Sequence, residues 1–325
     1  MSNPILVDVV RGPLVESRHR GSYAISDAKG ALVAQVGDIE SPVYPRSAIK
    51  AFQCLPLIES GGVDRFGLSD DDICLCCASH NGEEEHVRVA RSILHKADIE
   101  EVCLECGTHW PSSRDAAYAL VREGKPALAV HNNCSGKHAG MLAMAKHLKI
   151  DAKGYVNADH PIQRGVAEAL GRYCEVDIAR AAMGIDGCSV PTWAMPLKNL
   201  AKGFAKLSRD AAGQRIGKAA RGNPFLISGT GGFDTRIMTA IPRLFVKYGA
   251  EAVYCGFIAH AGLGFALKID DGSKRASEVA IAAALAKLDV WTPKEREALH
   301  GFATETQKNW RRIEVGEITA EILPS

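Results

Sequence analysis

The sequence has almost no excess of charge of either sign and no long uninterrupted hydrophobic run. Lys and Arg total 39 against 38 Asp and Glu, a net charge of +1, so there is no basic field to hold a phosphate backbone and nucleic acid is not expected as a partner. Apolar runs end well before the ~18 residues that a membrane-spanning helix needs, so no membrane is expected either. Asp8 interrupts the N-terminal apolar stretch too early for a secretory signal, which predicts a cytoplasmic protein.

Internal repeats, low-complexity tracts and linkers are also missing. The composition is that of a soluble globular chain, 46% hydrophobic and 24% charged, and it excludes extended disorder. At 325 residues the chain can bury a core without disulfide bonds. Three of its ten cysteines crowd between Cys74 and Cys77, so reduced thiols are expected, in agreement with a cytoplasmic location.

The hydrophobic pattern predicts a mixed α/β (α+β) fold with a mostly antiparallel sheet, flanking helices and a helical lobe. The first forty residues are expected to form strands, including a hairpin over 21–36, and Pro42 and Pro45 end this region. Three late segments, 243–248, 252–258 and 264–269, are joined too closely for parallel pairing. We therefore expect one catalytic unit over 1–325, with a sheet from about 1–40 and 240–290 and a helical lobe over about 60–230. Helices are expected over the following segments: 47–61, 83–96, 115–123, 135–149, 161–173, 197–207 and 276–288, with further helix starts at Ser69 and Asp234.

Three short motifs occur in a fixed order along the chain. Ser47 and Lys50 are spaced so that, at a helix start, the amine reaches the hydroxyl and can activate it. Taken alone, this motif is as well explained by a helix cap and a solvated lysine. Ser79-His80-Asn81 and Lys247-Tyr248-Gly249 follow, in a helical and a strand context. Together they match the three active-site elements of serine β-lactamases and penicillin-binding proteins, and they predict Ser47–Lys50 and Ser79–Lys247 pairs.

Two features argue against a β-lactamase proper. Such enzymes work outside the cytoplasm, whereas this chain is rich in thiols and has no export signal. The spacing also differs, because the first two motifs are close together and 168 residues separate Ser79 from Lys247.

A second cluster combines thiols with basic side chains. Cys134, Lys137 and His138 are spaced to share one side of a helix start, and Cys188 follows Asp186 in a later turn. Two thiolates could bind a soft divalent metal such as zinc, with His138 or Asp186 in support. The alternative from spacing alone is two buried structural cysteines.

Other motifs carry weaker signals. Cys103 and Cys106 form a CxxC without a second pair and are interpreted as structural. The glycine-rich segment 229–234 lacks the Lys and Ser/Thr of a phosphate-binding loop and is expected to form a turn. Glu83 is expected on a solvated first helical turn, although it follows Asn81 closely enough to face the site.

Five ordered motifs resemble the rhizobial-type, or class 3, L-asparaginases, and the resemblance covers essentially the whole chain. The motifs span residues 44–53, 78–83, 133–138, 184–191 and 247–251. The resemblance implies a fold similar to serine β-lactamases and glutaminases, a homodimer, and hydrolysis of L-asparagine to aspartate and ammonia.

By the same resemblance, the catalytic residues are Ser47, Lys50, Ser79 and Lys247. It also implies one zinc ion per subunit on Cys134, Lys137 and Cys188. Because the Ser–Lys chemistry needs no metal-bound hydroxide, we expect this zinc not to be essential for the chemical step. Substrate-binding candidates are Arg46, Asn81, Glu83, His138 and Asp186, of which Arg46 is the expected partner of the α-carboxylate. Three alternatives stay open: a glutaminase, a β-lactamase-like esterase or peptidase using the same serines, and a non-catalytic zinc-binding protein.

Overall fold

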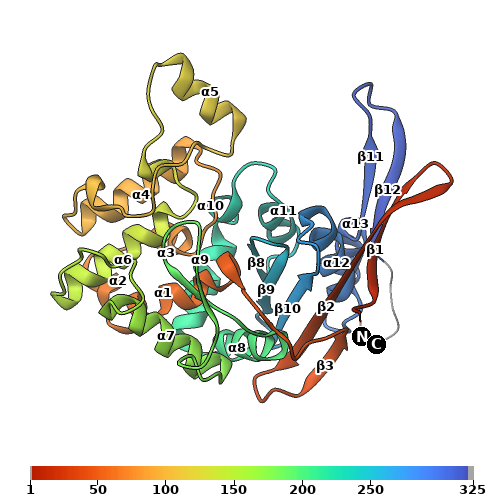
Figure 1. The fold of residues 1–325 in the computed structure, drawn as a ribbon, viewed down its shortest axis with the longest axis horizontal. Helices are drawn as coiled ribbons and strands as arrows, with labels where there is room; N and C mark the ends of the chain where they lie inside the picture. The colour runs from red at the N-terminus through yellow and green to blue at the C-terminus, as the bar shows by residue number, and fades with distance from the viewer. Residues whose placement is uncertain (1, 321–325) are drawn as a thin grey trace. The chain divides into compact units, whose positions relative to one another are not determined.

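The computed structural model describes residues 2–320, and within this range the chain divides into two compact units (Figure 1). We call them the sheet unit, Met1–Ala48 with Met195–Ser208 and Ala240–Ser325, and the helical unit, Ile49–Ala194 with Arg209–Thr239. The chain therefore passes from one unit to the other four times, at 48/49, 194/195, 208/209 and 239/240. None of the described helices has the length and hydrophobicity needed to cross a membrane.

The sheet unit is built on an antiparallel sheet, eight-stranded within the described residues. Its order is β11-β12-β1-β2-β10-β9-β8, with β3 paired to β2. The strands are β1 (Ile5–Arg11), β2 (Leu14–Asp27), β3 (Leu32–Val36), β8 (Leu244–Gly249), β9 (Val253–Ile258), β10 (Leu263–Ile269), β11 (Thr304–Lys308) and β12 (Glu314–Ala320). All six residues of β9 are buried, so both faces of the sheet are covered there. A short pair, β4 (Pro42–Val43) with β7 (Met195–Pro196), lies outside this sheet.

Three helices complete the sheet unit: α8 (Leu197–Arg209), α12 (Lys274–Ala286) and α13 (Pro293–Phe302). Helix α12 packs on β1, β9, β10 and β12. Helix α8 approaches β10 closely at Gly264, where a Cβ would lie 2.1 Å from the Ala201 carbonyl oxygen.

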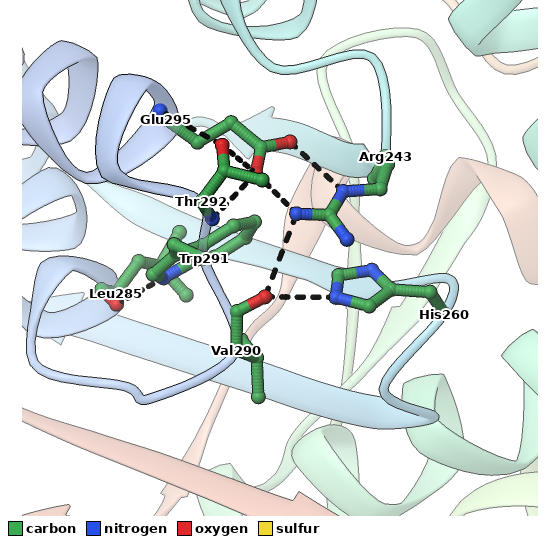
Figure 2. Close-up of polar contacts among 7 residues, drawn as sticks. All are labelled: Arg243, His260, Leu285, Val290, Trp291, Thr292 and Glu295. Atoms are coloured by element: carbon green, nitrogen blue, oxygen red, sulfur yellow. Dashed lines mark hydrogen bonds and ion pairs between the residues drawn. The ribbon is translucent and has the colours of Figure 1, made fainter.

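The link from α12 to α13 is anchored by the polar contacts in Figure 2. Arg243, just before β8, forms a two-pronged ion pair with Glu295 of α13 and donates to the Val290 carbonyl. His260 donates to the same carbonyl at 2.9 Å, and the Trp291 indole donates to the Leu285 carbonyl at 2.7 Å.

The helical unit centres on two buried helices, α1 (Lys50–Glu59) and α6 (Ser135–Leu148). Helix α1 contacts α3, α6, α7 and α9, and α6 also contacts α3 and α4. The other helices are α2 (Gly62–Arg65), α3 (Asp70–Cys76), α4 (Glu84–Lys96), α5 (Arg114–Arg122), α7 (Pro161–Cys174), α9 (Ala211–Gly222), α10 (Phe225–Ser228) and α11 (Phe233–Ala240). Hairpin β5–β6 (Met183–Ile185, Pro191–Trp193) also belongs here, and 3-10 turns occur at Arg46–Ile49, Glu101–Cys103 and Ala129–His131.

The predicted mixed fold, with an antiparallel sheet and a helical lobe, is confirmed. One difference concerns the predicted extent of the sheet, because β11 and β12 extend it beyond residue 290 to Ala320. A second concerns Ser47, which lies in the 3-10 turn Arg46–Ile49 and does not open the α-helix; α1 begins at Lys50. Arg46 has a φ of 52°, outside the right-handed helical region, and the chain leaves this residue through a tighter 3-10 turn before the α-helix begins.

Candidate active site

Ser47 and Lys247 lie in the sheet unit, on segments that approach each other closely. Gly249 ends β8, and a Cβ there would lie 2.3 Å from the Pro45 carbonyl oxygen and 2.9 Å from the Ala48 nitrogen. Side chains two residues apart on a strand point to the same face. The fully buried Lys247 therefore points to the face of β8 on which the Ser47 turn packs, and its Nζ donates to the Tyr248 carbonyl at 2.7 Å.

Lys50 and Ser79 lie in the helical unit and are joined by a hydrogen bond. The Lys50 Nζ is 3.0 Å from the Ser79 Oγ, and the lysine side chain is completely buried. It also donates to the Ala78 carbonyl and, at 3.4 Å, to the Asn133 carbonyl. The predicted pairs, Ser47 with Lys50 and Ser79 with Lys247, each join residues of different units and stay predictions.

The hydrogen-bond acceptors around Lys50 determine whether its amine can accept a proton. Carbonyl oxygens only accept hydrogen bonds, so the Ala78 and Asn133 carbonyls each take one N–H. A neutral amine has two N–H groups, and its lone pair would then face the Ser79 hydroxyl. The arrangement can therefore accept a proton from a serine.

Asn81 and Glu83 follow Ser79 in the loop before α4. The Glu83 carboxylate accepts hydrogen bonds from the Thr230 backbone N–H and hydroxyl, both at 2.8 Å, which fixes the glycine-rich turn predicted over 229–234. Burial acts to raise the pKa of Glu83, but these bonds and one from Asn81 hold it below its usual value. The Asn81 Oδ1 is buried without a hydrogen-bond partner among the described residues and lies close to Gly229, where a Cβ would be 2.2 Å from it.

Cys134, Lys137 and Cys188 meet in the interior of the helical unit. All three are buried, the Lys137 Nζ lies 2.9 Å from the Cys188 Sγ, and the two thiols are hydrogen-bonded to each other. The turn of hairpin β5–β6 carries Cys188, with Ser189 at a φ of 77°. Asp186 is half-buried in that turn, and its carboxylate accepts the Gly187 N–H at 2.8 Å.

The chemistry of this trio fits zinc, which binds thiolates and nitrogen donors. The bond from Cys188 and the charge of Lys137 hold the pKa of Cys134 well below its usual value, against the effect of burial. Within residues 2–320 no three His, Cys, Asp or Glu side chains are grouped to hold a metal. A metal at this trio would therefore need the Lys137 amine as its third protein ligand.

His138, next to Lys137 in helix α6, is completely buried. Its Nδ1 lies 2.7 Å from the Tyr155 hydroxyl, which accepts the Glu105 N–H at 2.9 Å. Its Nε2 has no hydrogen-bond partner among the described residues.

A groove of about 1260 Å³ opens beside Asn81 within the helical unit. Residues 81–84, α4 and the segment 111–128 line it. Helix α5, which has no buried residue, forms part of the wall. The loop that carries Ser79 therefore leads into open space.

The comparison with protein families gives a match over residues 7–320 to the model of L-asparaginase II. The chain belongs to the L-asparaginase II family. The resemblance seen in the motifs is thereby confirmed, and the family supports an amidohydrolase activity of the asparaginase type. Among curated proteins, none matches the chain in sequence.

One similar solved structure is a β-lactamase from Mycobacterium bovis. It shares 13% sequence identity with this asparaginase-family chain at a TM-score of 0.43, over 86% of this chain and 94% of that one. So low a score carries no argument about activity.

Two features of the site are not predicted by the motifs. The Lys50–Ser79 bond joins residues 29 positions apart, and His80 contacts Ser135, 55 positions away. The sequence carries the residue types, with His80 inside the Ser79 motif, but no periodic pattern pairs them.

Proposed function

We propose that the chain hydrolyses the side-chain amide of L-asparagine to L-aspartate and ammonia, with Ser47, Lys50, Ser79 and Lys247 as catalytic residues. The observation that carries the proposal is the buried Lys50 amine at 3.0 Å from the Ser79 hydroxyl in a chain of the L-asparaginase II family. A serine beside a neutral lysine is the nucleophile–base arrangement of acyl-transfer enzymes.

The chemistry follows from these groups. Lys50 takes the Ser47 proton, relayed by the Ser79 hydroxyl, as the Ser47 Oγ attacks the amide carbon. The C–N bond breaks, the leaving nitrogen takes a proton, and ammonia departs from an aspartyl ester of Ser47. Water then attacks the ester, gives a proton to the lysine–serine network and releases aspartate. Ser79 and Lys247 relay protons in both halves.

The substrate also needs partners for its charged groups. Arg46 is proposed to bind the α-carboxylate, and the unpaired Oδ1 of Asn81 to accept an N–H of the substrate. Glu83, His138 and Asp186 complete the proposed binding set, with Glu83 fixed by its two bonds to Thr230.

Three further expectations accompany this function. Cys134, Lys137 and Cys188 would hold one zinc ion per subunit, which when bound would orient substrate or neighbouring side chains and not generate the nucleophile. The enzyme is proposed to act in the cytoplasm as a homodimer.

The deciding experiment is ammonia release from L-asparagine by the purified chain. Parallel assays with L-glutamine, a chromogenic ester and a β-lactam test the alternative substrates. A higher kcat/KM on any of the three than on asparagine would overturn the assignment. Failure of all four assays, with metal bound, would favour a non-catalytic zinc protein.

The catalytic assignment predicts the effect of four single variants. Ser47→Ala, Lys50→Ala, Ser79→Ala and Lys247→Ala should each lower kcat by on the order of 10³-fold or more, and double variants should lose little further, because the residues act as a unit. Ser60→Ala, at the end of α1, is the matched control and should keep wild-type kinetics. Near-native turnover by Lys50→Ala would remove Lys50 from the mechanism.

The metal proposal predicts a different pattern for the thiols. Cys134→Ser and Cys188→Ser should abolish zinc binding and raise KM while part of kcat remains. Metal content by mass spectrometry and kinetics are measured on the same samples, with Cys103→Ser at an exposed position as control. Complete loss of turnover on chelation, restored by zinc, would show that the metal takes part in the chemical step.

A further inference from the structure

The Ser79 loop, residues 77–83 between α3 and α4, has no regular secondary structure of its own. The Ser79 N–H donates to the Ile227 carbonyl at 3.0 Å, which holds the backbone on one side. The next residue, His80, is almost completely buried and makes hydrogen bonds through both ring nitrogens. This imidazole is not used in the proposed chemistry.

The two hydrogen bonds of His80 fix its protonation. The Gly82 backbone N–H donates to Nδ1 at 3.1 Å. Because a backbone N–H can only donate, Nδ1 carries no proton and Nε2 carries one. Nε2–H therefore donates to the Ser135 Oγ, 3.0 Å away. Burial, with His86 and Lys50 nearby, lowers the pKa of His80 well below its usual value, in agreement with a neutral ring.

Ring stacking fixes the plane of the imidazole. His80 stacks on His86 with centroids 5.0 Å apart and planes 8° apart, and His86 stacks on Phe225 at 4.8 Å and 18°. His86 Nε2 donates to the Phe225 carbonyl at 3.2 Å. The His80 ring is thus held on its face and at both of its nitrogens.

The acceptor, Ser135, opens helix α6 and is completely buried. It follows Asn133, whose carbonyl accepts from Lys50 at 3.4 Å. The His80–Ser135 bond therefore connects the Ser79 loop to the same segment that holds the Lys50 amine. Each partner of the Lys50–Ser79 hydrogen bond is therefore linked to one end of this connection.

We propose that His80 is a positioning residue, whose hydrogen bond to Ser135 holds the Ser79 hydroxyl at bonding distance from Lys50. The role rests on the proposed function of Ser79 and Lys50. The expected effect of losing this bond on kcat follows from geometry, because a displacement of about 1 Å of a catalytic group can cost roughly 100-fold in rate.

Two variants separate the two hydrogen bonds of His80. His80→Asn places an oxygen where Nδ1 accepts from Gly82, but its side chain is too short to reach Ser135. In this variant kcat should fall roughly 10- to 100-fold, and KM should change less than about threefold. His80→Gln places an amide N–H near the Nε2 position and should restore most of kcat. Ser135→Ala breaks the same bond from the other side and should match His80→Asn, and the double variant should be no worse than either.

A readout independent of activity is amide hydrogen exchange over 77–83. Exchange should accelerate in His80→Asn and Ser135→Ala but stay near wild type in His80→Gln, with unchanged melting temperatures showing intact folds. Equal losses of kcat in the Gln and Asn variants, or wild-type kcat and exchange in Ser135→Ala, would overturn the proposal. If the wild-type chain releases no ammonia from asparagine, the proposed function fails, and the exchange pattern alone decides whether His80 positions the loop.

Discussion

The completely buried Lys50 shows how a single residue of a type that is usually exposed can be accommodated in the protein interior. An unpaired ammonium in the protein interior would be very costly, and here three oxygen atoms surround the amine, two from backbone carbonyls and one from Ser79. The residues beside it share this character, since His80 and His138 are buried as neutral rings whose pKa values are lowered by burial. The site thus concentrates buried titratable groups, two of them with shifted pKa values, as functional sites commonly do.

Gly249 provides a test at the same scale. A Cβ at this position would overlap the Pro45 carbonyl, at 2.3 Å, and push the Ser47 turn away from β8. Gly249→Ala should therefore lower the free energy of unfolding by about 1–3 kcal/mol and reduce kcat at least tenfold. Denaturant unfolding and kinetics check both effects.

The matched control is Gly301→Ala in helix α13, where a Cβ meets nothing within 4 Å. Alanine should stabilise that helix by about 0.5–1 kcal/mol and leave kcat unchanged. Wild-type kcat in Gly249→Ala would show that the Ser47 turn does not need this close approach.

At the scale of elements, the Arg243–Glu295 pair in Figure 2 joins the start of β8 to α13. Hydrogen bonds from Arg243 and Thr292 lower the pKa of Glu295 to about 2. A carboxyl whose pKa is lower in the folded state stabilises the fold above its ordinary pKa of 4.5, and this stabilisation is lost as the pH falls toward 2.

Glu295→Gln should accordingly lower the free energy of unfolding at pH 7 by about 1–3 kcal/mol, between the values for exposed and buried pairs. The difference from wild type should shrink steadily between pH 4.5 and pH 2. Glu297→Gln, at an exposed position of the same helix, serves as control with little effect at any pH. A wild-type-minus-variant difference that stays constant over this range would show that the ion pair contributes nothing.

Elements with local signals can be predicted from the sequence, and those defined by distant partners cannot. Ser69 caps α3 through a capping box with Asp72, and the late hairpins β8–β10 follow short apolar runs. In contrast, β11 (Thr304–Lys308) contains no apolar residue and is a strand only because β12 pairs with it. The hydrophobic pattern does not predict helix α9 either, since Ile216 is the one large apolar side chain on its buried side and the other buried residues there are Gly and Ala.

The same distinction applies to the site across the whole molecule. The residue types of the motifs predict a serine–lysine hydrolase, and the family match supports an amidohydrolase of the asparaginase type. The bonds from Lys50 to Ser79 and from His80 to Ser135 depend on how α1, α3 and α6 pack, and no local pattern encodes that packing. The sequence therefore predicts which side-chain types are present, whereas it does not predict how those side chains pair.

The pairing of β12 with β1 determines when the sheet can be completed during synthesis of the chain. Val7 lies opposite Ala320, so β1 leaves the ribosome 313 residues before its partner and waits for it on the order of tens of seconds at ordinary rates of synthesis. During that interval β1 and β2 expose apolar side chains, Leu6, Val7 and Val9 among them, that are buried in the finished sheet. The nascent β1–β2 hairpin thus presents apolar surface that a chaperone can cover while the chain is made.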